Sequence, residues 1–206
     1  LIVINGYNFM DGVNTLLIGY CLIISSSLYY LNLNDIEISQ IIDFYNFIPV
    51  LLALLILNFF NKLYLGDGGA YFLGLLFALC LINTYQINNN ISPYFIVCLL
   101  WYPAFENLFS ILRKKTFSRS PLKPDIYHLH QIIFLYLKKT FKVNIILLNT
   151  ATGMMINFYN LISIGIATHF YDHTKIQISI IFFNIIIYIF LYKNLTFKKK
   201  NNFKIS

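Results

Sequence analysis

Several ionisable side chains stand beside long apolar runs of this sequence, where charge is costly unless it is paired or functional. Carboxylates offer Mg²⁺ hard oxygen ligands, and imidazoles can contact phosphates or carry protons. Together with guanidinium groups, they are the parts needed for metal-assisted chemistry on a phosphate at a membrane surface. The candidate residues are Asp11, Asp67, Glu106, Asp125, His128, His130, Arg113 and Arg119.

The glycine-rich stretch YLGDGG at residues 64–69 contains Asp67, the candidate metal ligand. Its carboxylate suits Mg²⁺, and the flanking Gly66 and Gly68 let the backbone approach a bulky anion. A helix starting near Gly69 would direct its N-terminal N–H groups to the same place, which favours phosphate oxygens. The alternative is that Asp67 only caps that helix.

A second polar stretch, NGYNFMDGVN at residues 5–14, repeats polar side chains every three residues at a predicted helix entrance. The repeating residues are Asn8, Asp11 and Asn14. They could hydrogen-bond a polar ligand, or they could cap the helix and its neighbours.

The third stretch, RKKTFSRSPLKPDIYHLH at residues 113–130, is basic and carries two prolines that stiffen it. Asp125 precedes the pair His128 and His130, whose imidazoles could contact phosphates or carry protons. A zinc site is disfavoured because matching Cys or further His ligands are absent nearby in the sequence.

Glu106 lies in the inner part of an apolar run, one residue short of two helical turns before Arg113. At about 100° per residue, the two side chains share a helix face with Ser110 between them. Glu106 is therefore either functional or paired with Arg113 or another group at that end of the helix.

The elements that position these residues are predicted to be membrane helices. The chain has 206 residues, of which 58% are hydrophobic and 11% charged, and its mean hydropathy is +0.68. Such values exclude an ordinary soluble domain, and long continuous apolar runs favour helices over the strands of a barrel. We expect an all-α, polytopic membrane protein with about six transmembrane helices, at 13–33, 41–61, 69–86, 92–112, 143–169 and 176–193. Pro103 is expected to kink its helix.

The distribution of basic residues orients the predicted helices. With residues 5–12, 62–68, 113–142 and the tail 193–206 in cytoplasmic loops, fourteen of the fifteen Lys and Arg residues lie on that side. The net charge of +7 is then a topology signal, and nucleic acid is not an expected partner. All three polar stretches meet on the cytoplasmic face of one membrane domain, residues 1–206. Residues 1–4 are expected to end a further helix, so the domain is predicted to be truncated at its N-terminus.

The three stretches together resemble the polyprenyl-phosphate N-acetylhexosamine-1-phosphate transferases, the MraY and WecA family. NGYNFMDGVN looks like the family's Asn-x-x-Asn-x-x-Asp-Gly motif, and LGDGGAYFLG looks like its Gly-Asp-x-Gly-x-x-x-Leu-Gly motif. The run from Pro103 to SPLKPDIYHLH is similar to the helix and histidine loop of the WecA-like branch. Motif order, helix spacing and sidedness all agree with this resemblance.

The resemblance implies a reaction and roles for the residues. Such enzymes transfer a sugar 1-phosphate from a UDP-N-acetylhexosamine to polyprenyl (undecaprenyl) phosphate and release UMP, as the first step of a lipid-linked envelope glycan such as lipopolysaccharide. It implies Mg²⁺, with Mn²⁺ as an alternative, held by Asp67, and a multi-pass location in the bacterial inner membrane with the C-terminus in the cytoplasm. Catalysis is assigned to Asp67, Asp11, His128 and His130, and substrate binding to Asn8, Gly12, Asn14, Tyr64, Gly66, Gly68, Arg113, Arg119 and Asp125. Tyr64 is placed to stack on uracil, and a homodimer is left open.

The sequence also departs from the family's pattern. Asn14 and Thr15 stand where many relatives have Asp and Gly, Glu106 stands where Asp is common, and Gln131 stands where another His is frequent. The family's adjacent Asp-Asp motif, expected upstream, is absent, so the chain alone is expected to be incomplete. Two alternatives remain: an MraY-type reaction with UDP-MurNAc-pentapeptide, and a non-catalytic helical membrane subunit or transporter.

Overall fold

A computed structural model describes residues 1–116 and 127–202 of the chain, with side chains as far as residue 196. All regular elements in these ranges are α-helices, which confirms the all-α prediction. They are α1 (Ile2–Met10), α2 (Leu16–Leu33), α3 (Phe44–Phe59), α4 (Gly66–Ile87), α5 (Pro93–Leu99), α6 (Trp101–Thr116), α7 (Leu129–Thr140), α8 (Ile145–His169) and α9 (Thr174–Asn202).

Four helices of the described chain are long and apolar enough to cross a membrane, namely α2, α4, α8 and α9 over Thr174–Thr196. The consecutive helices α5 and α6 make a fifth if they are counted as one span, bent by 73°. The remaining predicted span, α3, is apolar but has only 16 residues, short of the roughly 20 that cross the hydrocarbon straight. We expected six membrane-spanning helices, and by length and composition the described residues contain four or five.

The bend between α5 and α6 has a local cause in Pro103. Proline has no backbone N–H, so the carbonyl four residues earlier, at Leu99, receives no helical hydrogen bond from it. The buried hydroxyl of Tyr20 on α2 donates to that carbonyl instead, at 3.0 Å. The predicted kink is present, and a neighbouring helix satisfies the carbonyl that it releases.

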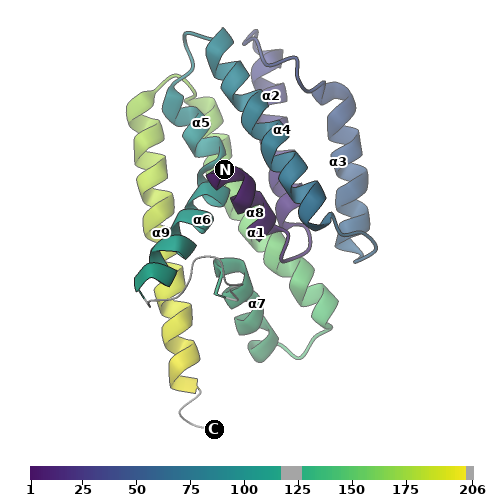
Figure 1. Ribbon diagram of the computed structural model, residues 1–206, viewed down its shortest axis with the longest axis vertical. Helices are drawn as coiled ribbons and strands as arrows, with labels where there is room; N and C mark the ends of the chain where they lie inside the picture. Colours follow the sequence, from purple (N-terminus) through teal and green to yellow (C-terminus); the bar gives the residue numbers. More distant parts are fainter. Residues whose placement is uncertain (117–126, 203–206) are drawn as a thin grey trace.

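The short helix α1 runs through the centre of the bundle beside α4 and α6 (Figure 1). Gly6 permits the approach to α6, because a Cβ added there would lie 2.0 Å from the backbone oxygen of Pro103. Tyr7 and Met10 are fully buried. Residues 5–10 were expected in a loop, and this expectation is wrong, because burial of these side chains favours a helix over a solvated loop.

Three further loop boundaries need correction. α4 already begins at Gly66, so Gly66–Gly68 of the expected loop 62–68 are helical. The expected loop 113–142 contains the end of α6 and all of α7, whose Leu129, Ile132 and Leu137 are buried on one side. The tail from 193 continues α9 to Asn202. Lysines made these segments resemble loops, although α7 has a helical spacing of apolar residues.

The three motif-bearing segments lie toward one end of the bundle. In Figure 1 the turn after α1 and the start of α4 lie near mid-height, and the start of α7 lies below them. The alternating directions of α2, α3 and α4 bring the first two of these segments to the same end. α7 packs against α8 and α9 and lies beside the lower part of α9 in Figure 1.

Candidate active site

The carboxylates of Asp11 and Asp67 interact at the meeting of two helix ends. Asp11 follows the last turn of α1, and Asp67 lies in the first turn of α4. Partial burial raises the pKa of Asp11, the nearby charge of Asp67 raises it further, and a hydrogen bond from the Gly66 backbone opposes both effects. A cation bound beside the two carboxylates would offset their mutual repulsion.

Open space adjoins this pair on the α4 side. Asp67 and Gly68 are exposed, and a Cβ added to Gly66 or Gly68 would meet no atom within 4 Å. Gly66 also has a φ of +65°, which L side chains rarely adopt. The backbone of α4 can thus be approached by a ligand at its N-terminus.

Two carboxylates beside open space fit a Mg²⁺ ion better than a zinc ion. Within the described residues, no group of three or more His, Cys, Asp or Glu side chains could hold a metal. Mg²⁺ is commonly held by one or two carboxylates, with water and substrate phosphates completing its shell. The carboxylates of Asp67 and Asp11 could be the protein's ligands to such an ion.

His130 links the histidine motif to the turn after α1. Its ring is fully buried, and neither ring nitrogen has a hydrogen-bond partner within the described chain. A Cβ added to Gly12 would lie 2.9 Å from its Nε2 atom. Burial lowers the pKa of His130 to about 4, despite an opposing effect of Glu106, so the ring is neutral near pH 7. It can therefore offer one donor and one acceptor.

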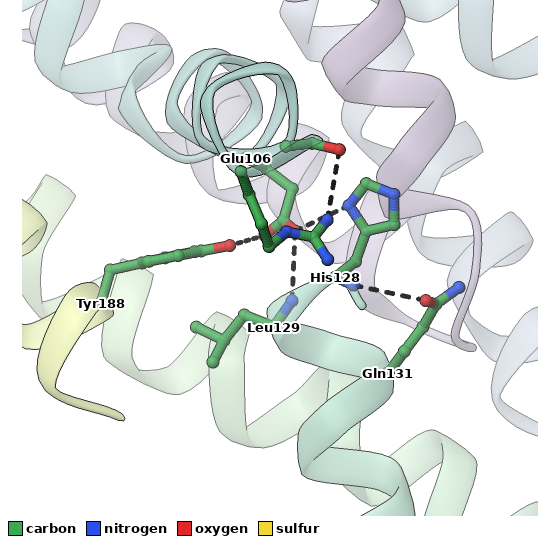
Figure 2. Close-up of polar contacts among 7 residues, drawn as sticks. Glu106, His128, Leu129, Gln131 and Tyr188 are labelled. Carbon is green, nitrogen blue, oxygen red and sulfur yellow. Dashed lines mark hydrogen bonds and ion pairs between the residues drawn. The ribbon is translucent and has the colours of Figure 1, made fainter. Parts of the chain in front are cut away.

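His128 lies beside His130 and is held by Glu106. The two histidine rings are parallel within 8°, with centroids 5.6 Å apart, and the Phe9 ring is 4.6 Å from that of His128. Glu106, 1% exposed, accepts from the Nδ1 atom of His128 at 2.9 Å and from the Leu129 N–H at 3.1 Å (Figure 2). Its other oxygen accepts from the hydroxyl of Tyr188 on α9 at 2.9 Å. Glu106 is therefore paired with groups at the start of α7, one of the alternatives left open above.

The predicted nucleoside-binding residues divide between accessible and buried positions. Tyr64 is 61% exposed, and the Asn8 amide donates to the hydroxyl of Tyr71 at 3.1 Å. Asn14 is 2% exposed, and its amide donates to Asn61 at 2.9 Å. The Tyr64 hydroxyl donates to the same Asn61 oxygen. Asn61 thus accepts hydrogen bonds from both Asn14 and Tyr64. The side chain of Asn14 is buried and hydrogen-bonded within the protein.

A strained residue follows Asn14. Thr15 has a φ of 66°, which is rare for a β-branched side chain, in line with glycine being common here in the resembling family. Its N–H donates to Asn58, and its carbonyl accepts from Asn157 at 2.8 Å. Amides from α3 and α8 therefore hold the turn that carries Asp11 and Gly12.

Of the predicted arginines, Arg113 lies beside the site and Arg119 lies outside the described residues, as does Asp125. The Arg113 guanidinium donates to Ser110 at 3.4 Å and lies over the rings of Tyr127 and Tyr192, at 5.6 and 5.7 Å. A half-buried guanidinium over aromatic faces is stabilised by the attraction between the cation and the rings.

The sequence analysis missed Tyr188, Asn58 and Asn61 as site residues. Tyr188 stands in a long apolar run, and only the packing of α9 places it beside Glu106. Polar Asn58 at the end of the apolar run of α3 was a usable signal, because an amide there is expected to bond backbone groups.

Two comparisons with known proteins found a match to part of this chain. Residues 1–85 match the family model described as glycosyl transferase family 4. The chain is similar to a decaprenyl-phosphate N-acetylglucosaminephosphotransferase of Mycolicibacterium smegmatis, with 30% identity over 149 residues. That match covers 62% of this chain and 37% of the relative. No solved structure matches the chain significantly.

The matched residues 1–85 contain both the Asp11 and the Asp67 motifs, and the structure brings these two side chains together. Both matches support a relationship of this part of the chain to the polyprenyl-phosphate hexosamine-1-phosphate transferases. The chain spans 37% of the length of the relative that it matches.

Proposed function

We propose that the complete gene product transfers N-acetylhexosamine 1-phosphate from a UDP-sugar to polyprenyl phosphate, such as undecaprenyl phosphate, and releases UMP. One observation carries the proposal. The adjacent residues Asp11 and Gly12 meet the other two motifs: Asp11 accepts a hydrogen bond from the Gly66 backbone and lies within the electrostatic influence of Asp67, and Gly12 lies against His130. Three stretches far apart in the sequence thus surround one turn at the end of a membrane bundle.

The proposed reaction replaces one phosphoanhydride (pyrophosphate) bond with another. An oxygen of polyprenyl phosphate attacks the β-phosphorus of the UDP-sugar, and the bond from that phosphorus to the bridging oxygen breaks, so that UMP leaves. Asp67 and Asp11 would hold Mg²⁺, or Mn²⁺ as the alternative, and the bound ion would neutralise charge on the pyrophosphate. Positioning of the phosphates is then the main task of the protein.

The described side chains have suitable places for that task. His130 is neutral and has both nitrogens unpaired within the described chain, so it can donate one hydrogen bond to a phosphate oxygen. Tyr64 is exposed beside the start of α4, where its ring can stack on uracil. The acceptor phosphate would arrive from the bilayer, which we propose is the bacterial inner membrane with the motif-bearing end in the cytoplasm.

The position of a radioactive label tests this reaction class directly. Membranes containing the complete gene product would be given UDP-N-acetylglucosamine or UDP-N-acetylgalactosamine labelled at the β-phosphate, together with undecaprenyl phosphate and Mg²⁺. We expect the label in the lipid fraction and unlabelled UMP in the aqueous fraction. Label retained in released UDP would indicate transfer of the sugar alone and contradict the proposal. Lipid labelling only with UDP-MurNAc-pentapeptide would favour the MraY-type alternative.

A further inference from the structure

The buried carboxylate of Glu106 joins three helices whose contacts the proposed function has not yet used. Glu106 comes from α6, and it accepts hydrogen bonds from His128 and Leu129 at the start of α7 and from Tyr188 on α9. Burying a carboxylate is costly unless its oxygens receive hydrogen bonds, and here both oxygens do. Figure 2 shows Glu106 between Tyr188 on one side and the start of α7 on the other.

The bond to Nδ1 fixes the chemical form and the direction of the His128 ring. An ionised carboxylate can only accept, so Nδ1 carries the hydrogen, and Nε2 is the nitrogen left for other partners. No residue of the described chain hydrogen-bonds that Nε2 atom. A carboxylate behind an imidazole also stabilises positive charge on the ring whenever the ring gains a proton.

The same bond orients the second histidine and thereby the turn that carries Asp11. The His128 ring lies parallel to the His130 ring, and the Nε2 atom of His130 lies against Gly12. To anchor α7 alone, Glu106 would need only the bond to the Leu129 N–H, one of the unsatisfied donors of a helix N-terminus. The hydrogen bonds from His128 and Tyr188 to Glu106 additionally fix the orientation of the His128 ring, which anchoring of the helix does not require.

We propose, resting on the function above, that Glu106 and Tyr188 are positioning residues that hold His128 with its Nε2 atom available to substrate phosphate. Tyr188 lies about sixty residues after the histidine motif, on the last helix of the chain. Its ring packs edge-on against Phe105 and Phe109, with centroids 4.9 and 5.2 Å away, so Tyr188→Phe removes one hydroxyl and keeps this packing.

A matched pair of tyrosine variants tests the proposal in the complete gene product. Tyr159 on α8 donates to Asn184 on α9 at 2.6 Å, a hydroxyl bond of the same kind away from Glu106. For Tyr188→Phe we expect kcat for UMP release to fall about fivefold to tenfold, with the KM for the UDP-sugar within about twofold. Tyr159→Phe should change neither constant. Equal losses in both variants, or no loss in Tyr188→Phe, would overturn the proposal.

A double-mutant cycle with Glu106 then separates positioning from general stabilisation. Glu106→Gln should lower kcat about tenfold or more, whereas Glu106→Asp, which keeps the charge, should recover most of the loss. In a His128→Ala background, Glu106→Gln should lower kcat by less than about twofold more, because the side chain that Glu106 positions is no longer there. If Glu106→Gln lowered kcat in the His128→Ala background as much as it does in the wild type, the positioning role would be overturned. Absence of UMP release in the wild-type protein would instead contradict the proposed function itself.

Discussion

Gly12 and His130 are in contact across the site, although 118 positions separate them in the sequence. A Cβ added to Gly12 would lie 2.9 Å from the Nε2 atom of the buried His130. Since Gly12 follows Asp11 directly, this contact places the histidine motif next to the carboxylate pair of Asp11 and Asp67. The position of one glycine therefore connects the buried imidazole of His130 with the candidate metal site.

We predict that Gly12→Ala displaces His130 and lowers both stability and activity. The added methyl is too close to Nε2, so the ring or the turn must shift, at a cost on the order of 1–3 kcal/mol. Thermal unfolding in detergent should show a lower Tm. In a His130→Ala background, which frees the space, the same substitution should leave the Tm unchanged. An equal Tm loss in both backgrounds would mean that the two residues are not in contact.

Gly68→Ala should separate function from folding. No atom of the described residues lies within 4 Å of a Cβ added at Gly68, and Ala favours a helix over Gly by roughly 0.5–1 kcal/mol. We expect an unchanged or higher Tm together with at least about a tenfold loss of UMP release, because the methyl occupies the approach to α4. Gly165→Ala on α8, which also meets no atom within 4 Å, is the control and should keep full activity. Full activity in Gly68→Ala would indicate that substrate does not approach there.

Stability should fall as pH falls, because His130 is buried and neutral. Its folded-state pKa of about 4 lies below the ordinary value of 6.5, so the unfolded chain binds the proton first. The stabilising contribution is present above about pH 6.5 and is lost as pH falls toward 4. His130→Gln should show a smaller decrease of Tm between pH 7 and pH 5 than the wild type, and the exposed His169→Gln should behave like the wild type. Identical pH profiles of all three proteins would contradict burial of a neutral ring.

Gly6→Ala tests the central place of α1. The new Cβ would meet the backbone oxygen of Pro103 at 2.0 Å, and backbone at a helix crossing cannot move aside as a flexible side chain can. We expect one of the largest Tm losses of any glycine substitution in the chain. A Tm equal to that of Gly165→Ala would show that α1 does not pack against α6.

Much of the fold was predictable because hydrophobic length is a strong signal. Helices occur in all six predicted runs, and Pro103 marked a real bend. The helices α1 and α7 were missed for different reasons. α1 has nine residues, among them Gly6 and Asn8, and only its packing between two helices makes it helical. In α7, lysines obscured an apolar spacing that would have predicted a helix.

The candidate site was predictable as a meeting of motifs but not as a set of contacts. Charge distribution alone placed the three stretches at one end of the bundle. The link from His128 through Glu106 to Tyr188 depends on how α9 crosses α6, which no local pattern encodes. The burial of Asn14 likewise depends on Asn61, whose backbone takes a left-handed φ of 60° beyond the end of α3.

The rate of Mg²⁺-dependent UMP release by Asp67→Asn tests the central claim most directly. The complete gene product would be assayed in membranes at saturating UDP-N-acetylhexosamine and undecaprenyl phosphate, with the exposed Asp172→Asn as the control. We predict a loss on the order of a hundredfold or more for Asp67→Asn, with unchanged expression and Tm, and wild-type rates for Asp172→Asn. Wild-type Mg²⁺-dependent turnover in Asp67→Asn would contradict the assignment of Asp67 and, with it, the proposed active site.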